Sequence, residues 1–113
     1  GELPDGCCVQ LSEWTHTGTL GIAEGIETAM AASARFGIPV WSAINATMLG
    51  KWLPPDGCES VVVFGDNDAS YAGHAAAYRL AHRLAARQIP VSVQIPPTPG
   101  DDWADVWARF KAA

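Results

Sequence analysis

The chain has 113 residues, of which 49% are apolar, so it is long enough for one domain with a packed core and too apolar for a disordered segment. The net charge of −5 excludes a generally basic surface that would coat nucleic acid. No stretch is long and apolar enough to span a bilayer, and three cysteines with an adjacent pair form neither a disulfide framework nor a zinc pattern. We therefore expect a cytoplasmic protein with reduced thiols and no membrane association.

Short apolar runs and alanine-rich segments alternate along the chain, with glycine- and proline-containing turns between them. Residues 7–13 alternate weakly and are compatible with an edge strand. Further strands are predicted at residues 20–23, 40–43, 61–64 and 90–95, where short apolar runs occur, and the run at residues 61–64 is mostly β-branched. Helices are predicted at residues 26–36, 46–53 and 72–87. A last helix, capped by Asp101 or Asp102, is predicted through Lys111, with Val106, Phe110 and Trp103 facing inward.

This alternation of strand and helix predicts the fold class. We expect one α/β domain with a mostly parallel, four-stranded central sheet flanked by helices on both faces, and an extra edge strand at the N-terminus. No internal repeat, linker or low-complexity segment divides the chain.

The run Val61–Phe64 ends at Gly65 and is followed by Asp66 and Asp68. Such a run is typical of a strand buried on both faces of a parallel sheet, and open α/β sheets bind ligands where their strands end. Two carboxylates ~5 Å apart repel by about 3 kcal/mol at an effective dielectric of ~20, and a bound divalent cation would offset this. For an isolated Asp-x-Asp pair, a helix cap and a solvated turn residue are the commoner interpretation.

Other acidic residues share this placement, which favours the functional interpretation. Glu24 follows the strand at residues 20–23, and Asp102 and Asp105 follow the strand at residues 90–95 after a proline-rich loop. Because parallel strands end at one edge of their sheet, these carboxylates are expected to converge there. Oxygen ligands without nearby His or Cys select Mg²⁺ or Mn²⁺, which serve phosphoryl and nucleotidyl transfer.

Three motifs in this order carry a family resemblance. They are Gly-Ile-Ala-Glu-Gly-Ile-Glu-Thr-Ala at residues 21–29, the segment 61–68 with the downstream Ala72-Gly73, and Gly-Asp-Asp-Trp-Ala-Asp-Val-Trp at residues 100–107. On these motifs the chain resembles the topoisomerase–primase (Toprim) domain, most closely that of primases from phages, plasmids and other mobile elements. The resemblance covers roughly residues 20–107.

The resemblance implies a DNA primase-type nucleotidyltransferase that uses Mg²⁺ or Mn²⁺ to support RNA primer synthesis in replication. Its partners would be nucleoside triphosphates and single-stranded DNA. It implies Glu24 as the catalytic acid or base, Asp66 and Asp68 as the metal-binding pair, and Asp102 and Asp105 as additional metal-site residues. Residues 1–113 would then be the Toprim-like catalytic domain of a longer primase with zinc-binding and helicase domains, weak or inactive alone.

Other positions match the family less directly. Gly25 would let phosphate approach the backbone. Thr28 stands where cellular primases carry an aspartate, and residues 69–71 lengthen the connection to the helix at residues 72–87. On that helix Arg79 and Arg83 belong to a row at intervals of four that could contact a nucleic-acid backbone, although such a row is more often a solvated face.

Three alternatives remain open at this point. A Toprim-type nuclease would use the same glutamate and aspartates to cleave phosphodiester bonds. A receiver-like signalling domain also has an acidic pocket at parallel strand ends, but it needs a late lysine, and no lysine lies between Lys51 and Lys111. A non-catalytic nucleic-acid-binding module would not need intact Glu24, Asp66 and Asp68.

Overall fold

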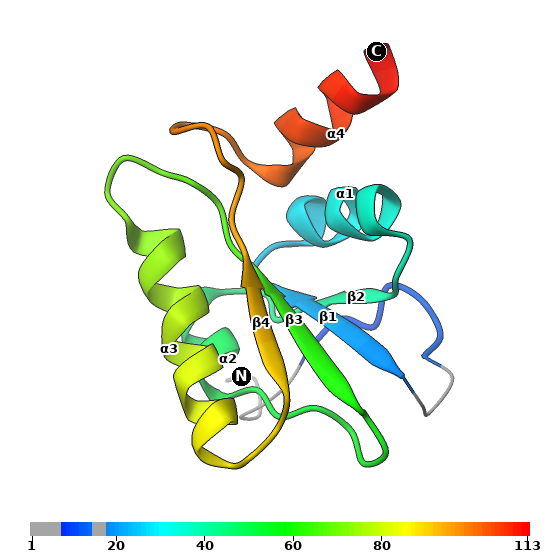
Figure 1. The fold of residues 1–113 in the computed structure, drawn as a ribbon, viewed down its shortest axis with the longest axis vertical. Coiled ribbons are helices and arrows are strands. Elements are labelled where there is room, and N and C mark those ends of the chain that lie inside the picture. The colour runs from blue at the N-terminus through cyan, green and yellow to red at the C-terminus, as the bar shows by residue number, and fades with distance from the viewer. Residues whose placement is uncertain (1–7, 15–17) are drawn as a thin grey trace, which may run out of the picture.

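The computed structural model describes residues 8–14 and 18–113. Strands and helices alternate strictly along these residues (Figure 1). The strands are β1 (Thr19–Ala23), β2 (Val40–Ser42), β3 (Ser60–Phe64) and β4 (Val91–Gln94). The helices are α1 (Ile26–Phe36), α2 (Ala46–Lys51), α3 (Ala72–Ala86) and α4 (Trp103–Ala112). Each predicted strand after the N-terminal segment, and each predicted helix, is therefore confirmed.

The strands form one parallel sheet in the order β2-β1-β3-β4. The two central strands are β1 and β3, and their register pairs Ala23 with Phe64. Phe64 also pairs with Gln94 at the end of β4. Ala23 also pairs with Ser42 at the end of β2, so the expected four-stranded parallel sheet is confirmed and all four strands end level with one another.

Helices cover both faces of this sheet, as predicted (Figure 1). Helices α2 and α3 contact each other on one face, and α1 and α4 contact each other on the other face. The core under α2 and α3 contains large side chains, including Leu20, Ile22, Trp52, Leu80 and Leu84. The buried residues of α1 are alanines (Ala29, Ala31 and Ala32), which allow this helix to lie close to the sheet.

Helix α4 is anchored by its first residue. The Trp103 ring is buried and packs edge-on against Phe64 of β3 and Phe36 of α1, with ring centroids 5.8 and 5.2 Å apart. The expectation that Phe110 faces inward is wrong, because its side chain is 54% exposed. The later turns of α4 project away from the sheet (Figure 1). Phe110 stacks on Trp107 instead.

Two boundaries differ from the predictions. Helix α2 ends at Lys51, two residues earlier than predicted, and Trp52 has an extended backbone. Leu53 cannot readily continue the helix, because it precedes Pro54 and a residue before proline disfavours helical geometry. The expected N-terminal edge strand reduces to one antiparallel bridge between Val9 and Ser42, while Cys7 lies outside the described residues. Within the described parts of the chain, no helix has the length and apolar character needed to cross a membrane.

Candidate metal and phosphoryl-transfer site

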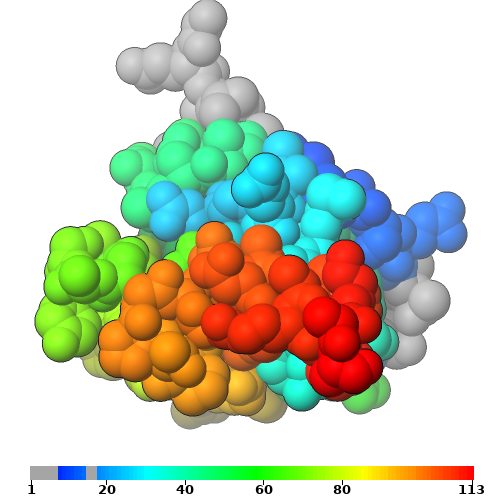
Figure 2. All heavy atoms as spheres, turned by 90° about the horizontal axis from the view of Figure 1, so that it is seen from above, coloured from blue at the N-terminus to red at the C-terminus, as the bar shows by residue number. Residues whose placement is uncertain are grey.

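The strand register brings the predicted acidic segments to one edge of the sheet. Glu24 directly follows Ala23, and Asp66 follows Phe64 by two residues, so the pairing of Ala23 with Phe64 makes both segments leave the sheet at the same level. The chain after β4 returns to this edge before α4 begins. Figure 2 views the molecule from this side, where the segments after β1, β3 and β4 all reach the surface.

Asp66 lies at the centre of this edge and is half-buried. Burial raises the pKa of the Asp66 carboxyl, and the negative charges of Asp102 and Glu24 raise it further. The backbone N–H of Trp103 and the hydroxyl of Thr28 oppose this shift; the Thr28 hydroxyl donates to Oδ2 at 3.4 Å. Oδ1 is buried and has no hydrogen-bond partner among the described residues. Thr28 of α1 therefore fixes one carboxylate oxygen, and the two hydrogen-bond donors offset only part of the cost of burying this carboxyl.

Asp68 is held by the start of α3. Its Oδ2 accepts a hydrogen bond from the backbone N–H of Gly73 at 3.1 Å, and its Oδ1 accepts one from the Ser70 hydroxyl at 3.3 Å. A Cβ atom on Gly73 would lie 2.7 Å from the carbonyl oxygen of Asp66 and 3.2 Å from Oδ2 of Asp68. The glycine in this motif is thus a packing requirement, because the helix start touches the acidic loop directly.

Asp102 and Asp105 form a capping box at the start of α4. Oδ1 of Asp102 accepts from the N–H of Asp105 at 2.7 Å, and Oδ2 of Asp105 accepts from the N–H of Asp102 at 3.0 Å. The charge of Asp102 also acts on Asp66, whereas Asp105 is exposed. The metal role of Asp102 stays a prediction, although its charge reaches Asp66. That of Asp105 stays a prediction, since its carboxylate already has a capping role.

Two residues that sequence analysis did not single out position the acidic loops. Asn67 donates through Nδ2 to the carbonyl of Pro96 at 2.8 Å, and its backbone N–H donates to the carbonyl of Asp101 at 2.9 Å. The loops after β3 and β4 are thereby joined. Ser42, fully buried at the end of β2, donates through its hydroxyl to the Glu24 carbonyl at 3.1 Å. Buried side-chain hydrogen bonds of this kind have no sequence signal beyond a polar residue beside a strand end.

The predicted phosphate or nucleic-acid contacts are divided between the two ends of the molecule. Gly25 is the N-cap of α1, next to Glu24, and the space where a Cβ would lie is open. Arg79 lies at the middle of α3 and Arg83 in its last turn, about 15 Å along the helix from Gly73. The Arg83 guanidinium donates to the Trp52 carbonyl beyond the end of α2. Its nucleic-acid contact stays a prediction, and the structure gives it a structural partner instead.

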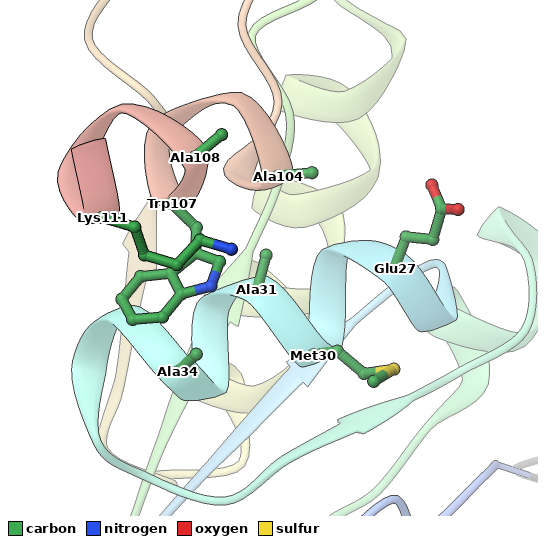
Figure 3. A pocket seen from close by; sticks show the side chains of 8 residues that line it. All are labelled: Glu27, Met30, Ala31, Ala34, Ala104, Trp107, Ala108 and Lys111. Atoms are coloured by element: carbon green, nitrogen blue, oxygen red, sulfur yellow. The ribbon is translucent and has the colours of Figure 1, made fainter.

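A groove of about 510 Å³ lies between α1 and α4 (Figure 3). It is lined by the apolar side chains of Met30 and Trp107 and by several alanines, with Glu27 near one end and Lys111 near the other. Trp107 is partly buried and packs against the edge of the core, whereas Trp103 is fully part of it.

The residues at the acidic edge fit a hard divalent cation. Their donors are carboxylate oxygens, and Asp66 presents a buried oxygen without a partner, which a cation would satisfy. Among residues 8–14 and 18–113, however, no three Asp, Glu, His or Cys side chains already form a metal-binding group. The Asp102 carboxylate would have to turn toward Asp66 for a cation to gain a further ligand.

The fold and this edge together define a class: a parallel α/β domain whose acidic residues gather where its central strands end. Comparison with known families then identifies the family. The model for the Toprim domain matches residues 19–112, and the chain belongs to this family. This assignment sets aside the receiver-like alternative.

The chain is also similar to a solved structure, a DNA primase domain from Pseudomonas aeruginosa. The two share 18% sequence identity with a TM-score of 0.56, over 86% of this chain and 32% of the other. At this identity the likeness is one of fold, and the chain spans about a third of the length of that protein. No curated protein matches the chain.

Proposed function

We propose that the chain is the nucleotidyl-transfer domain of a DNA primase, acting within a longer protein that supports RNA primer synthesis on single-stranded DNA. Membership of the Toprim family and the fold similarity to a primase domain support this proposal. The observation that carries it is the state of Asp66, whose unpartnered buried oxygen lies under the charges of Asp102 and Glu24. Folding alone gives no reason to keep such a carboxylate.

The aspartates at the acidic edge are the proposed metal ligands. Asp66 and Asp68 would hold Mg²⁺ or Mn²⁺, with Asp102 beside them. When bound, the cation neutralises negative charge on the phosphate groups of the substrate. Thr28 orients Asp66 through Oδ2, and Gly73 orients Asp68 through its backbone N–H.

Glu24 is exposed at the same edge and is the proposed proton carrier. Its carboxylate accepts the proton of the primer 3′-hydroxyl as that oxygen attacks the α-phosphate of the incoming nucleoside triphosphate. The new phosphodiester bond forms as the bond between the α-phosphorus and the α,β-bridging oxygen breaks, and pyrophosphate leaves. Ser42 holds the Glu24 backbone at the end of β1, so the glutamate is presented from a fixed point. The open space at Gly25 leaves room for phosphate beside it.

The metal site is tested by thermal melting with and without Mn²⁺. At ten times the dissociation constant, binding stabilises the domain by about 1.4 kcal/mol, which raises the melting temperature by roughly 5 °C. Asp66→Asn and Asp68→Asn should abolish this shift. Glu59→Gln is the matched control, because Glu59 is an exposed acid at the opposite edge of the sheet, before β3. An equal Mn²⁺ shift in all four proteins would contradict the proposed site.

The reaction is tested in the longer protein by primer synthesis on a single-stranded template, with plasmid nicking measured in parallel. Glu24→Gln should abolish primer synthesis while leaving the Mn²⁺ shift of the domain intact, because the proton carrier and the metal pair are separate. Primer synthesis at the wild-type rate by Glu24→Gln would remove the assigned role. Metal-dependent nicking without primer synthesis would replace the primase assignment with the nuclease one.

A further inference from the structure

Tyr71 occupies a position where a tyrosine is unfavourable. It ends the loop after Asp68 and precedes α3, and its φ angle of 60° lies in the left-handed region that side chains with a Cβ disfavour. The ring is 68% exposed, so burial does not offset this conformation. A glycine or asparagine would adopt the same backbone with less strain.

No local structural role accounts for the tyrosine either. Tyr71 is the N-cap residue of α3, but its side chain makes no capping hydrogen bond. The N–H of Gly73 is instead capped by Oδ2 of Asp68. The Tyr71 ring contacts His74, with ring centroids 5.4 Å apart, and the pair stands on the surface of the loop that carries Asp68. The backbone N–H of Tyr71 donates to the Asp68 carbonyl at 3.1 Å, which ties the ring to the acidic edge.

A second exposed residue with a left-handed backbone lies on another loop at the acidic edge. Ile44, two residues after the end of β2, has a φ of 80° and is 37% exposed. Its N–H donates to the Ser42 hydroxyl, which in turn holds the Glu24 carbonyl. In the described parts of the chain the third such residue is Gln88, past the end of α3, where left-handed geometry ends a helix in the usual way. Strained, exposed apolar residues therefore occur on two of the loops that surround the site, as is common at functional sites.

From these observations we propose that Tyr71, backed by His74, is a stacking platform for a nucleobase next to the acidic site. The proposal rests on the proposed function and names a substrate contact for it. Aromatic side chains bind single-stranded nucleic acid by stacking on base faces with little sequence preference. The ring is exposed, its backbone N–H is bonded to the metal-binding loop, and the His74 ring lies tilted against it, which together describe such a platform. The base could belong to a single-stranded template or primer, or to the incoming nucleotide.

The test measures binding of the 113-residue chain to fluorescent oligo-dT, to an abasic oligonucleotide of equal length and to ATP, each with Mg²⁺. Tyr71→Ala should weaken binding of the base-carrying ligand by about tenfold, and Tyr71→Phe should preserve it. Binding of the abasic strand should not change. Tyr78→Ala is the matched control, because Tyr78 is also exposed on α3 but lies beyond its first turn.

Oligo-dT and ATP distinguish a base of the template or primer from the base of the incoming nucleotide. A loss confined to oligo-dT assigns the platform to template or primer, and a loss confined to ATP assigns it to the incoming nucleotide. Unchanged affinity for both ligands in Tyr71→Ala, or no measurable binding of either ligand by the wild-type chain, would overturn the proposal. The Mn²⁺ thermal shift is measured on the wild type and on Tyr71→Ala as well. If both proteins show the shift while base binding is absent or unchanged, the stacking proposal fails and the proposed metal site stands.

A stability measurement separates binding from folding. If the tyrosine is retained for a ligand, Tyr71→Gly should melt a few degrees higher than the wild type, because glycine adopts this backbone freely. A clearly lower melting temperature would show that the ring stabilises the loop itself, and it would overturn the assignment to a ligand.

Discussion

The hydroxyl of Thr28 lies 3.4 Å from Oδ2 of Asp66 and joins residues 38 positions apart in the sequence. Thr28 is in the first turn of α1, which follows Glu24 directly, and Asp66 follows β3. This contact couples the glutamate motif to the aspartate motif. It also gives a use to the threonine where cellular primases carry an aspartate: it orients a carboxylate without adding another negative charge.

Asp66→Asn should stabilise the metal-free domain at neutral pH. Burial raises the pKa of the Asp66 carboxyl above its ordinary value of 3.8, so the ionised form costs stability at every pH above the folded-state pKa. That cost disappears as the pH falls through the folded-state pKa toward the unfolded one. The advantage of Asp66→Asn, measured by urea denaturation without metal, should therefore be largest near pH 7 and shrink toward pH 4. An advantage that grows on acidification would contradict the assigned cause.

Gly73→Ala should destabilise the domain even though alanine is the better helix former. The new Cβ would lie 2.7 Å from the Asp66 carbonyl oxygen, which belongs to the backbone and cannot move independently. We expect a loss of about 1–3 kcal/mol in urea denaturation, together with a weaker Mn²⁺ shift.

Gly50→Ala is the matched control for that substitution. Gly50 lies in α2, and nothing lies within 4 Å of the position its Cβ would occupy. This change should stabilise the domain by up to about 1 kcal/mol, as expected from helix propensity. Equal effects of the two substitutions would show that α3 does not press on the acidic loop.

Asn67→Ala should weaken the connection between the loops that follow β3 and β4. The lost hydrogen bond from Nδ2 to the Pro96 carbonyl costs about 1 kcal/mol. Because the same loops carry Asp68 and Asp102, metal affinity should fall more than this modest stability loss would suggest. Isothermal titration with Mn²⁺ compares the variant with the wild type, and an unchanged affinity would show that the two loops are positioned independently.

Arg83→Ala and Arg79→Ala should differ in what they affect. Arg83 donates to the Trp52 carbonyl and is partly buried, so its loss should cost about 1–3 kcal/mol in urea denaturation. Arg79 is exposed, and its removal should change stability by less than about 0.5 kcal/mol. If both arginines instead contact nucleic acid, each substitution should lower the salt dependence of oligonucleotide binding by a similar amount.

The element order and the sheet edge followed from the sequence because both depend on short-range patterns. The run Val61–Phe64, the stop at Gly65 and the cap at Asp102 each act within a few residues. Parallel strands joined through helices must end on one edge, so the convergence of Glu24 and Asp66 followed from topology alone.

The state of each carboxylate was decided only by the tertiary structure. The burial of Asp66 depends on α1 and α4 meeting over the end of β3. The capping role of Asp105 and the hydrogen bond from Arg83 to Trp52 depend on the geometry of each contact. Desolvation and hydrogen-bond pairing arise from atoms brought together from distant parts of the chain. A sequence pattern therefore places acidic residues at an edge, but packing determines which oxygen is left without a partner.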